Sequence, residues 1–189
     1  FTATSGRRYD LASGTVSHNV TTPGYFLTTS GGTLFQTGAP DFTTTRFYAS
    51  GVEPSGALSN HPPVEFGQVS GFSGPLAFDA AGNLYYATGF GAHQIYRWSA
   101  SEVAAALAEP LGNPLEQAGH LWADYSALFS GVDGGSAMTF DEEGNLVITL
   151  TSFVSTSHLA VFEVDENGLF AGASTLLSSS ERLTDLRFY

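Results

Sequence analysis

Short apolar runs separated by polar, glycine-containing turns recur along this chain. The segment Leu76–Tyr85 places two apolar stretches around Asp-Ala-Ala-Gly-Asn, and Met138–Val147 repeats this arrangement without a gap. A fainter copy occupies Phe26–Phe35, where two glycines stand at the turn. A strand, a glycine-containing turn and a second strand are the signature of a β-hairpin. We therefore predict three equivalent hairpins, with Gly82 and Gly144 at positive φ angles.

A further strand-like run follows each hairpin and is rich in aromatic and β-branched residues, which favour buried strands. These runs are Arg46–Ala49, Ile95–Trp98 and Val161–Val164. Units of roughly 40 to 60 residues, each a small antiparallel sheet, are typical of β-propeller blades. The sequence predicts an all-β fold, a partial or small β-propeller of antiparallel blades in a single domain, 1–189. Its repeat units are expected near 26–50, 76–99 and 138–165.

Both ends of the chain contain partial units. Arg8–Gly14 resembles Val161–Gly168, and Leu186–Tyr189 resembles Leu76–Phe78, so Phe188 is expected to face the core. At about 50 residues a unit, fewer than four units fit into 189 residues. We therefore expect an incomplete propeller whose ends pack against another chain or the remainder of its own.

The segment after the second unit carries helix signals. Ser99 followed by Glu102 forms a capping box, alanines and a leucine follow, and Pro110 ends the pattern. We predict a short helical excursion near 99–110. It should pack on the outside of the sheets through residues that share one helix face, namely Val103, Ala106 and Leu107.

Two other connecting segments carry weaker signals. Asn113-Pro114 favours the start of a second short helix that runs toward Trp122 and Phe129. The stretch from Ser50 to Gly74 is rich in Gly, Pro and Ser, which is typical of an irregular surface excursion.

The paired Phe-Asp-x-x-Gly-Asn-Leu hairpins that begin at Phe78 and Phe140, together with Ile95–Leu107, resemble NHL and lactonase-like β-propeller repeats. Such repeats are found in exported bacterial proteins, including some with PEP-CTERM sorting tails. The resemblance implies a propeller fold and an extracellular or cell-surface location, with the periplasm as the alternative. It also implies an alternative function, a metal-dependent hydrolase or lyase, whose relatives hold a divalent metal on the propeller axis. No axial metal ligand of that kind can be assigned in this sequence.

The amino-acid composition excludes some classes of binding partner. Six Lys and Arg residues, all of them arginine, stand against 18 acidic residues, giving a net charge of −12. Nucleic acid is not expected as a partner, because affinity for phosphates depends on clustered cations. No apolar run approaches the roughly 18 residues of a membrane helix, so no membrane insertion is expected in this segment. Asn19 begins an N-glycosylation sequon, and cysteine is absent.

Candidate chemistry is sparse. Asp79 and Asp141 recur at one position of the hairpins, where a carboxylate is expected to accept hydrogen bonds from the turn backbone. The histidines lack metal-site spacing, and His93 and His158 are expected to be hydrogen-bonded near one rim of the propeller. No G-x-S-x-G elbow or phosphate loop occurs. The sequence assigns no catalytic, cofactor-binding or metal-ligating residue, and it implies no cofactor.

Aromatic residues are the remaining candidates for binding. Five of them could form a sugar-stacking surface, although aromatics on strands are more often core packing. They are Tyr85, Tyr86, Tyr96, Trp98 and Trp122. The sequence favours a non-catalytic exported module that binds a protein or a glycan, or that builds a cell-surface assembly.

Overall fold

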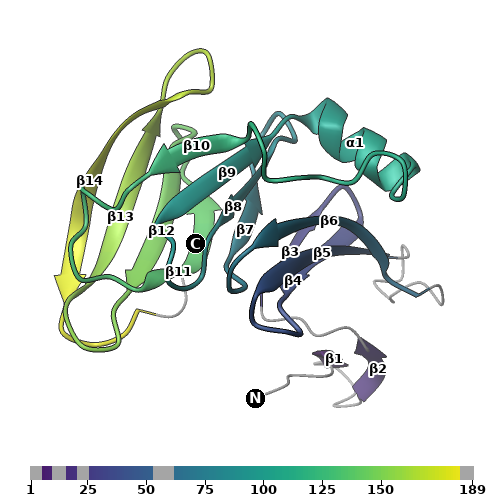
Figure 1. Cartoon of the computed structure of the whole chain (residues 1–189), viewed down its shortest axis with the longest axis horizontal. Helices are drawn as coiled ribbons and strands as arrows, with labels where there is room; N and C mark the ends of the chain where they lie inside the picture. Colours follow the sequence, from purple (N-terminus) through teal and green to yellow (C-terminus); the bar gives the residue numbers. More distant parts are fainter. Residues whose placement is uncertain (1–5, 10–15, 21–25, 53–61, 184–189) are drawn as a thin grey trace.

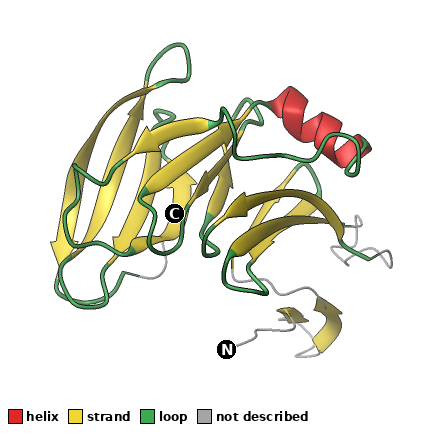
Figure 2. Ribbon diagram, in the orientation of Figure 1, coloured by secondary structure: helices red, strands yellow, loops and turns green. Residues whose placement is uncertain are grey.

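The computed structural model describes residues 6–9, 16–20, 26–52 and 62–183, and almost all of its regular structure is β (Figures 1 and 2). Three four-stranded antiparallel sheets, here called blades, follow one another along the chain. The prediction of an all-β fold of antiparallel blades is confirmed.

Each blade is a simple meander, with its strands in chain order. The first blade contains β3 (Phe26–Ser30), β4 (Thr33–Gly38), β5 (Thr44–Gly51) and β6 (Val64–Ser70). The second contains β7 (Leu76–Phe78), β8 (Leu84–Ala87), β9 (Gln94–Trp98) and β10 (Leu121–Asp124). The third contains β11 (Gly134–Phe140), β12 (Leu146–Thr151), β13 (Ser157–Val164) and β14 (Phe170–Ser179).

The blades are arranged radially. The first strand of the second blade, β7, contacts the first strands of both neighbours, β3 and β11. The later strands fan outward, as Figure 1 shows for β12 to β14 and for β8 to β10. This arrangement is that of an arc of a propeller. A separate antiparallel pair, β1 (Gly6–Tyr9) and β2 (Val16–Val20), lies outside the three blades.

The three repeated hairpins adopt the conformations that their glycines predict. In the first blade both turn residues, Gly31 and Gly32, have positive φ, at 54° and 74°. Two-residue hairpin turns of this kind match the twist of the flanking strands. Gly82 and Gly144 have φ of 84° and 86° in the second and third blades. Each predicted hairpin forms the first two strands of its blade, although the first has a two-residue turn and the other two have longer turns, 79–83 and 141–145.

Two apolar cores lie between successive blades. The first joins the first and second blades, with the Phe47 and Trp98 rings edge to face at 5.4 Å. The second joins the second and third blades, with Tyr85 against Phe140 at 5.0 Å. Because side chains alternate along a strand, the two faces of β8 serve different cores. Tyr86 belongs to the first core and Tyr85 to the second.

This packing decides the role of the strand aromatics. Tyr85, Tyr86, Tyr96 and Trp98 are all buried, and Trp122 packs against the second core. They are core residues and form no sugar-stacking surface.

The predicted helix is present as α1 (Ala100–Ala108). Ser99 Oγ accepts from the Glu102 backbone N–H at 3.3 Å, and Glu102 Oε2 accepts from the Ser99 N–H at 2.8 Å. Val103 and Ala106 are buried in the first core, with Leu107 packed beside them. The helix therefore covers the outer end of that core and contacts β6 (Figure 2).

Two predictions for the connecting segments are wrong. No second helix follows Asn113; the chain instead lies along the outer strand of the first blade. The Leu115 N–H donates to Phe66 O at 2.9 Å, and Leu115 O accepts from the Gln68 N–H at 3.0 Å. The stretch from Ser50 to Gly74, expected to be irregular, contributes β6. Both errors have one cause, since the exposed backbone of an edge strand gains hydrogen bonds from whatever chain can reach it.

Some expectations lie outside the described residues. The placement of Leu186–Tyr189, including Phe188, is among them, as are the side chains of β1 and β2. The helix found in the described ranges is nine residues long, and none there is long and apolar enough to cross a membrane.

The helix cap can be tested by truncation. Ser99→Ala removes the acceptor for the Glu102 N–H, and we expect the free energy of unfolding to fall by about 1 kcal/mol in a urea titration. Ser180→Ala, at an exposed serine outside the helix, serves as the control and should change it by less than about 0.5 kcal/mol. Equal losses in the two variants would contradict the cap.

Acid sensitivity follows from carboxylates that accept backbone hydrogen bonds in turns. The N–H of Leu169 lowers the pKa of Asp165, and Ser99 lowers that of Glu102. A depressed native pKa stabilises the fold above the unfolded-chain value, about 3.9 for Asp, and this contribution is lost as the pH falls through the native value. Asp165→Asn keeps an acceptor oxygen but no longer titrates. Between about pH 5 and pH 2, its unfolding free energy should fall less steeply than that of the wild type.

Candidate functional site

The blades meet solvent at one end through loops that share a chemical character. Because the strands alternate in direction, the β4–β5, β6–β7, β8–β9 and β12–β13 loops and the start of β3 all lie at the same end. The hairpin turns with Gly31, Gly82 and Gly144 lie at the opposite end. We call the first the loop end. A pocket of about 470 Å³ opens there.

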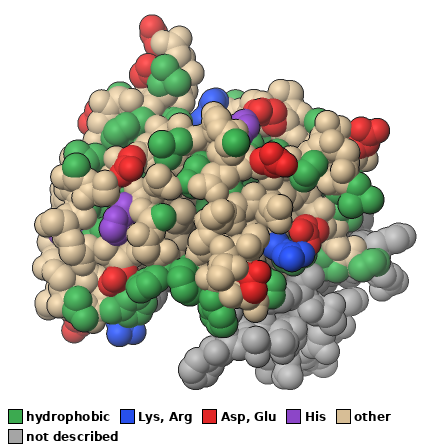
Figure 3. Space-filling model, in the orientation of Figure 1, with side chains coloured by type: hydrophobic (Ala, Val, Ile, Leu, Met, Phe, Trp, Pro, Cys, Tyr) green, Lys and Arg blue, Asp and Glu red, His purple; other side chains and the backbone are tan. Residues whose placement is uncertain are grey.

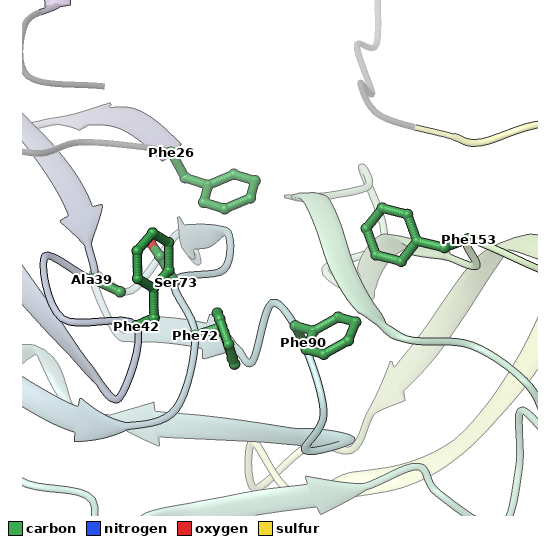
Figure 4. A pocket seen from close by; sticks show the side chains of 7 residues that line it. All are labelled: Phe26, Ala39, Phe42, Phe72, Ser73, Phe90 and Phe153. Carbon is green, nitrogen blue, oxygen red and sulfur yellow. The ribbon is translucent and has the colours of Figure 1, made fainter. Parts of the chain in front are cut away.

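Phenylalanine dominates the lining of this pocket (Figure 4). One ring comes from the start of β3 and the other four from the four loops, so all three blades contribute. The lining residues are Phe26, Ala39, Phe42, Phe72, Ser73, Phe90 and Phe153. We call this site the phenylalanine pocket.

Four of these rings form a continuous row across the blades. Phe42 and Phe72 lie 6.0 Å apart between ring centroids, Phe72 and Phe90 5.2 Å, and Phe90 and Phe153 5.9 Å. The central pair is edge to face at 79°. Rings separated by 4.5 to 7 Å in tilted or edge-to-face arrangements attract one another. Contacts between neighbouring rings therefore stabilise the row, which lines the pocket and leaves it open.

These rings are exposed rather than packed into a core. Phe42 is 45% exposed, Phe72 38%, Phe90 42% and Phe153 51%. They are all the strongly exposed phenylalanines in the described ranges. Figure 3 shows hydrophobic side chains along the lower edge of the view, below the ends of the blades. Such a cluster at the surface marks a binding site more often than scattered apolar residues do.

Backbone contacts between glycines bring the central rings together. Gly74 precedes β7, and Gly89 follows β8; a Cβ on Gly89 would collide with the Ser73 carbonyl, and one on Gly74 with the Ala87 carbonyl. The Gly89 N–H donates to Phe72 O at 3.2 Å. Phe90 is the next residue, so this close approach places its ring beside that of Phe72.

Phe42 is held in an unfavourable backbone conformation. Its φ is +58°, the left-handed region that non-glycine residues avoid. The Phe42 N–H donates to Ala39 O at 3.2 Å and closes a turn whose second residue is Pro40. Phe42 is its fourth residue, where glycine is preferred. Asp41 Oδ1 then accepts from Thr43 and Thr44, and these bonds lower the pKa of Asp41. The loop thus keeps a strained backbone conformation that directs the Phe42 ring toward the pocket.

Polar groups are few at the pocket. The Ser73 hydroxyl donates to Thr37 Oγ1 at 2.9 Å, so only its acceptor lone pairs are free. Arg182 lies outside the lining, with its guanidinium carbon 4.5 Å from the Phe153 ring centroid. This cation–π contact leaves the lining itself uncharged.

The residues singled out from the sequence do not enter the pocket. Asp79 Oδ1 accepts from the Asn83 N–H at 2.8 Å, and Asp141 Oδ1 from the Asn145 N–H at 2.7 Å, which confirms their role in the turns. Each motif asparagine also ties its turn to the chain at the end of the third strand. The Oδ1 atom of Asn83 accepts from Ala100 N, the first residue of α1, at 3.0 Å, and that of Asn145 accepts from Val164 N, the last residue of β13, at 3.4 Å.

The two histidines near the loop end are hydrogen-bonded, as predicted. His93 Nε2 lies 2.8 Å from Val132 O, and His158 Nδ1 lies 3.0 Å from Ser178 Oγ. Neither lines the phenylalanine pocket. Within the residues that the structure describes, no group of three or more His, Asp and Glu side chains is placed to hold a metal ion.

A more polar hollow of about 320 Å³ lies beside α1. His120 stacks on Trp98 at 5.6 Å, and its Nε2 atom is 3.6 Å from Glu102 Oε1. Glu102 is already occupied by the helix cap through its other oxygen. The contacts that line this hollow therefore mainly hold α1 against the second blade.

Sequence reasoning missed the phenylalanine pocket, although one signal was present. Its loop phenylalanines stand alone among small or polar residues, as in Gly71–Gly74 and Gly89–Gly91. A single aromatic residue between glycines lies outside any alternating strand pattern, so no strand carries its side chain into a core. That these loops converge on one site follows from the radial arrangement of the blades.

Comparisons with known proteins add little. No protein-family model matches the chain, and no curated protein matches it in sequence. Among solved structures, a luciferin-regenerating enzyme is similar over 76% of this chain, with 12% identity and a TM-score of 0.43. The chain spans 43% of the length of that protein.

The strain at Phe42 predicts an asymmetry between two glycine substitutions. Phe42 and Phe90 are similarly exposed, so each loses a comparable amount of packing when replaced by glycine. Only Phe42→Gly also relieves a left-handed backbone, which costs roughly 1–2 kcal/mol for an L-residue. In urea unfolding, Phe42→Gly should be less destabilising than Phe90→Gly by about that amount. Equal effects would show that Phe42 is unstrained.

Proposed function

We propose that this chain is a non-catalytic propeller module that acts by binding another protein chain or the remainder of its own. The observation that carries the proposal is the outer face of the third blade, which points away from the second core. A face of this kind is what each blade buries against the next within the arc.

The register of the third blade defines this outer face. Val147 pairs with Val161, and Leu159 pairs with both Thr149 and Leu177. Because side chains alternate, these residues lie opposite Ile148 and Ala160, which fill the second core. The outer face therefore consists of small, β-branched and aliphatic residues.

Near its inner strands the outer face is already covered, since Val147 and Thr149 are only 1% and 2% exposed. Toward its rim it is uncovered. Leu177 is 53% exposed, and Leu159 and Val161 are half-buried. None of the outer-face residues belongs to either core. Contiguous apolar surface beside an edge strand favours association with a further sheet.

The setting remains that expected from the sequence. The absence of lysine and the net charge of −12 support an exported, surface-located protein. A glycan partner would require a stacking surface other than the strand aromatics, because those are buried. The alternative, a metal-dependent hydrolase or lyase, is favoured by no specific observation, since turn hydrogen bonds occupy the repeated aspartates.

The association can be measured by light scattering on the 189-residue chain. We expect self-association that Leu177→Asp reduces, because the substitution places a charge on the outer face. Thr175→Asp puts the same charge on the same strand but on its other face, and it should leave the association unchanged. A stable wild-type monomer with cooperative unfolding would overturn the proposal, as would equal effects of the two variants.

A further inference from the structure

We propose that the phenylalanine pocket binds a small molecule that carries an aromatic ring and no negative charge. This site lies at the loop end, no residue of the outer face of the third blade lines it, and its role is independent of the assembly proposed above.

The size and lining of the pocket fit such a ligand. A volume of about 470 Å³ falls within the 300–1,000 Å³ typical of small-molecule sites. Such sites are mostly apolar and contain a few placed polar groups. Here Ser73 is the one polar side chain in the lining, and its free lone pairs can accept a single N–H or O–H from the ligand.

The arrangement of the rings favours an aromatic over an aliphatic ligand. In Figure 4, the Phe26, Phe72 and Phe90 rings stand around an open space rather than stacking on one another. Ring faces are negative and ring edges positive, so another ring gains directional contacts in this space that an alkyl chain lacks.

The ligand carries no negative charge, because the lining holds no cation that could pair with an anion. The ring faces disfavour an anion, and the acidic protein repels one at longer range. Arg182 lies outside the lining and is already placed over the Phe153 ring.

Core packing does not explain the gathering of these rings. Phe42 keeps its ring at the pocket despite the left-handed backbone, and the exposed phenylalanines of the described ranges all converge here. A chain selected for stability alone would place glycine at position 42. Strain retained at a surface cleft is characteristic of functional sites.

The test is a titration of the intact chain with N-phenyl-1-naphthylamine, a neutral aromatic fluorophore that brightens in apolar surroundings. We expect saturable one-site binding that Phe90→Ala weakens by about tenfold. Phe90→Leu keeps an apolar side chain without the ring and should weaken binding less. Leu111→Ala truncates a fully exposed apolar residue outside the pocket and should bind as the wild type does.

Three further measurements make the result decisive. Phe42→Gly should also weaken binding while the protein stays folded, which separates loss of the site from loss of the fold. The anionic probe 8-anilinonaphthalene-1-sulfonate should bind more weakly than the neutral one. Leu177→Asp should bind the probe normally, so that failure of the assembly proposal leaves this one standing.

The proposal is overturned if the wild type shows no saturable binding, or if Phe90→Ala binds as Leu111→Ala does. It is also overturned if the anionic probe binds as tightly as the neutral one. A further contrary result would be a dimer in light scattering that Phe90→Ala dissociates, because a second copy of the chain would then occupy the pocket.

Discussion

The close approach of backbone at the inner ends of the blades is the contact on which the rest of the structure depends. Gly74, Gly89 and Gly134 lie where the chain enters β7, leaves β8 and enters β11, and a Cβ on any of them would collide with a neighbouring carbonyl. Without side chains at these points, the chain before β7 can lie against the end of β8, and the third blade can meet the second. The Gly135 N–H donates to Thr88 O at 3.0 Å and extends the contact to the third blade. The same approach brings the loop phenylalanines to one site.

Two cores follow from that arrangement, since each gap between blades is filled by aromatic and branched side chains from the facing sheets. The second blade is buried on both faces, so alternate residues such as Tyr85 and Tyr86 serve different cores. The outer blades each bury one face in these cores and carry another that lies outside them. This asymmetry is the observation on which we base the proposed assembly role.

The phenylalanine pocket differs from the cores in how its aromatic rings are held. In the cores, aromatic rings are buried and relaxed, whereas at the loop end they are exposed, and Phe42 sits on a strained backbone. Burial of Phe47 stabilises the fold through the first core, while exposure of Phe42 gains nothing comparable. The uncharged lining and the single serine confine the chemistry of the site to recognition of apolar groups.

Local patterns in the sequence determined the hairpins, the turn aspartates and the helix. Glycine at positive φ, an Asp carboxylate over a turn and a Ser–Glu capping box each act within a few residues, so their outcome is readable without the fold. The sequence could not show that the chain after Pro110 pairs with β6 through Leu115, because an edge strand takes its partner from distant residues. Nor could it show that Phe42, Phe72, Phe90 and Phe153 share one pocket. Their loops are far apart in the chain, and only the radial packing of the blades brings them together.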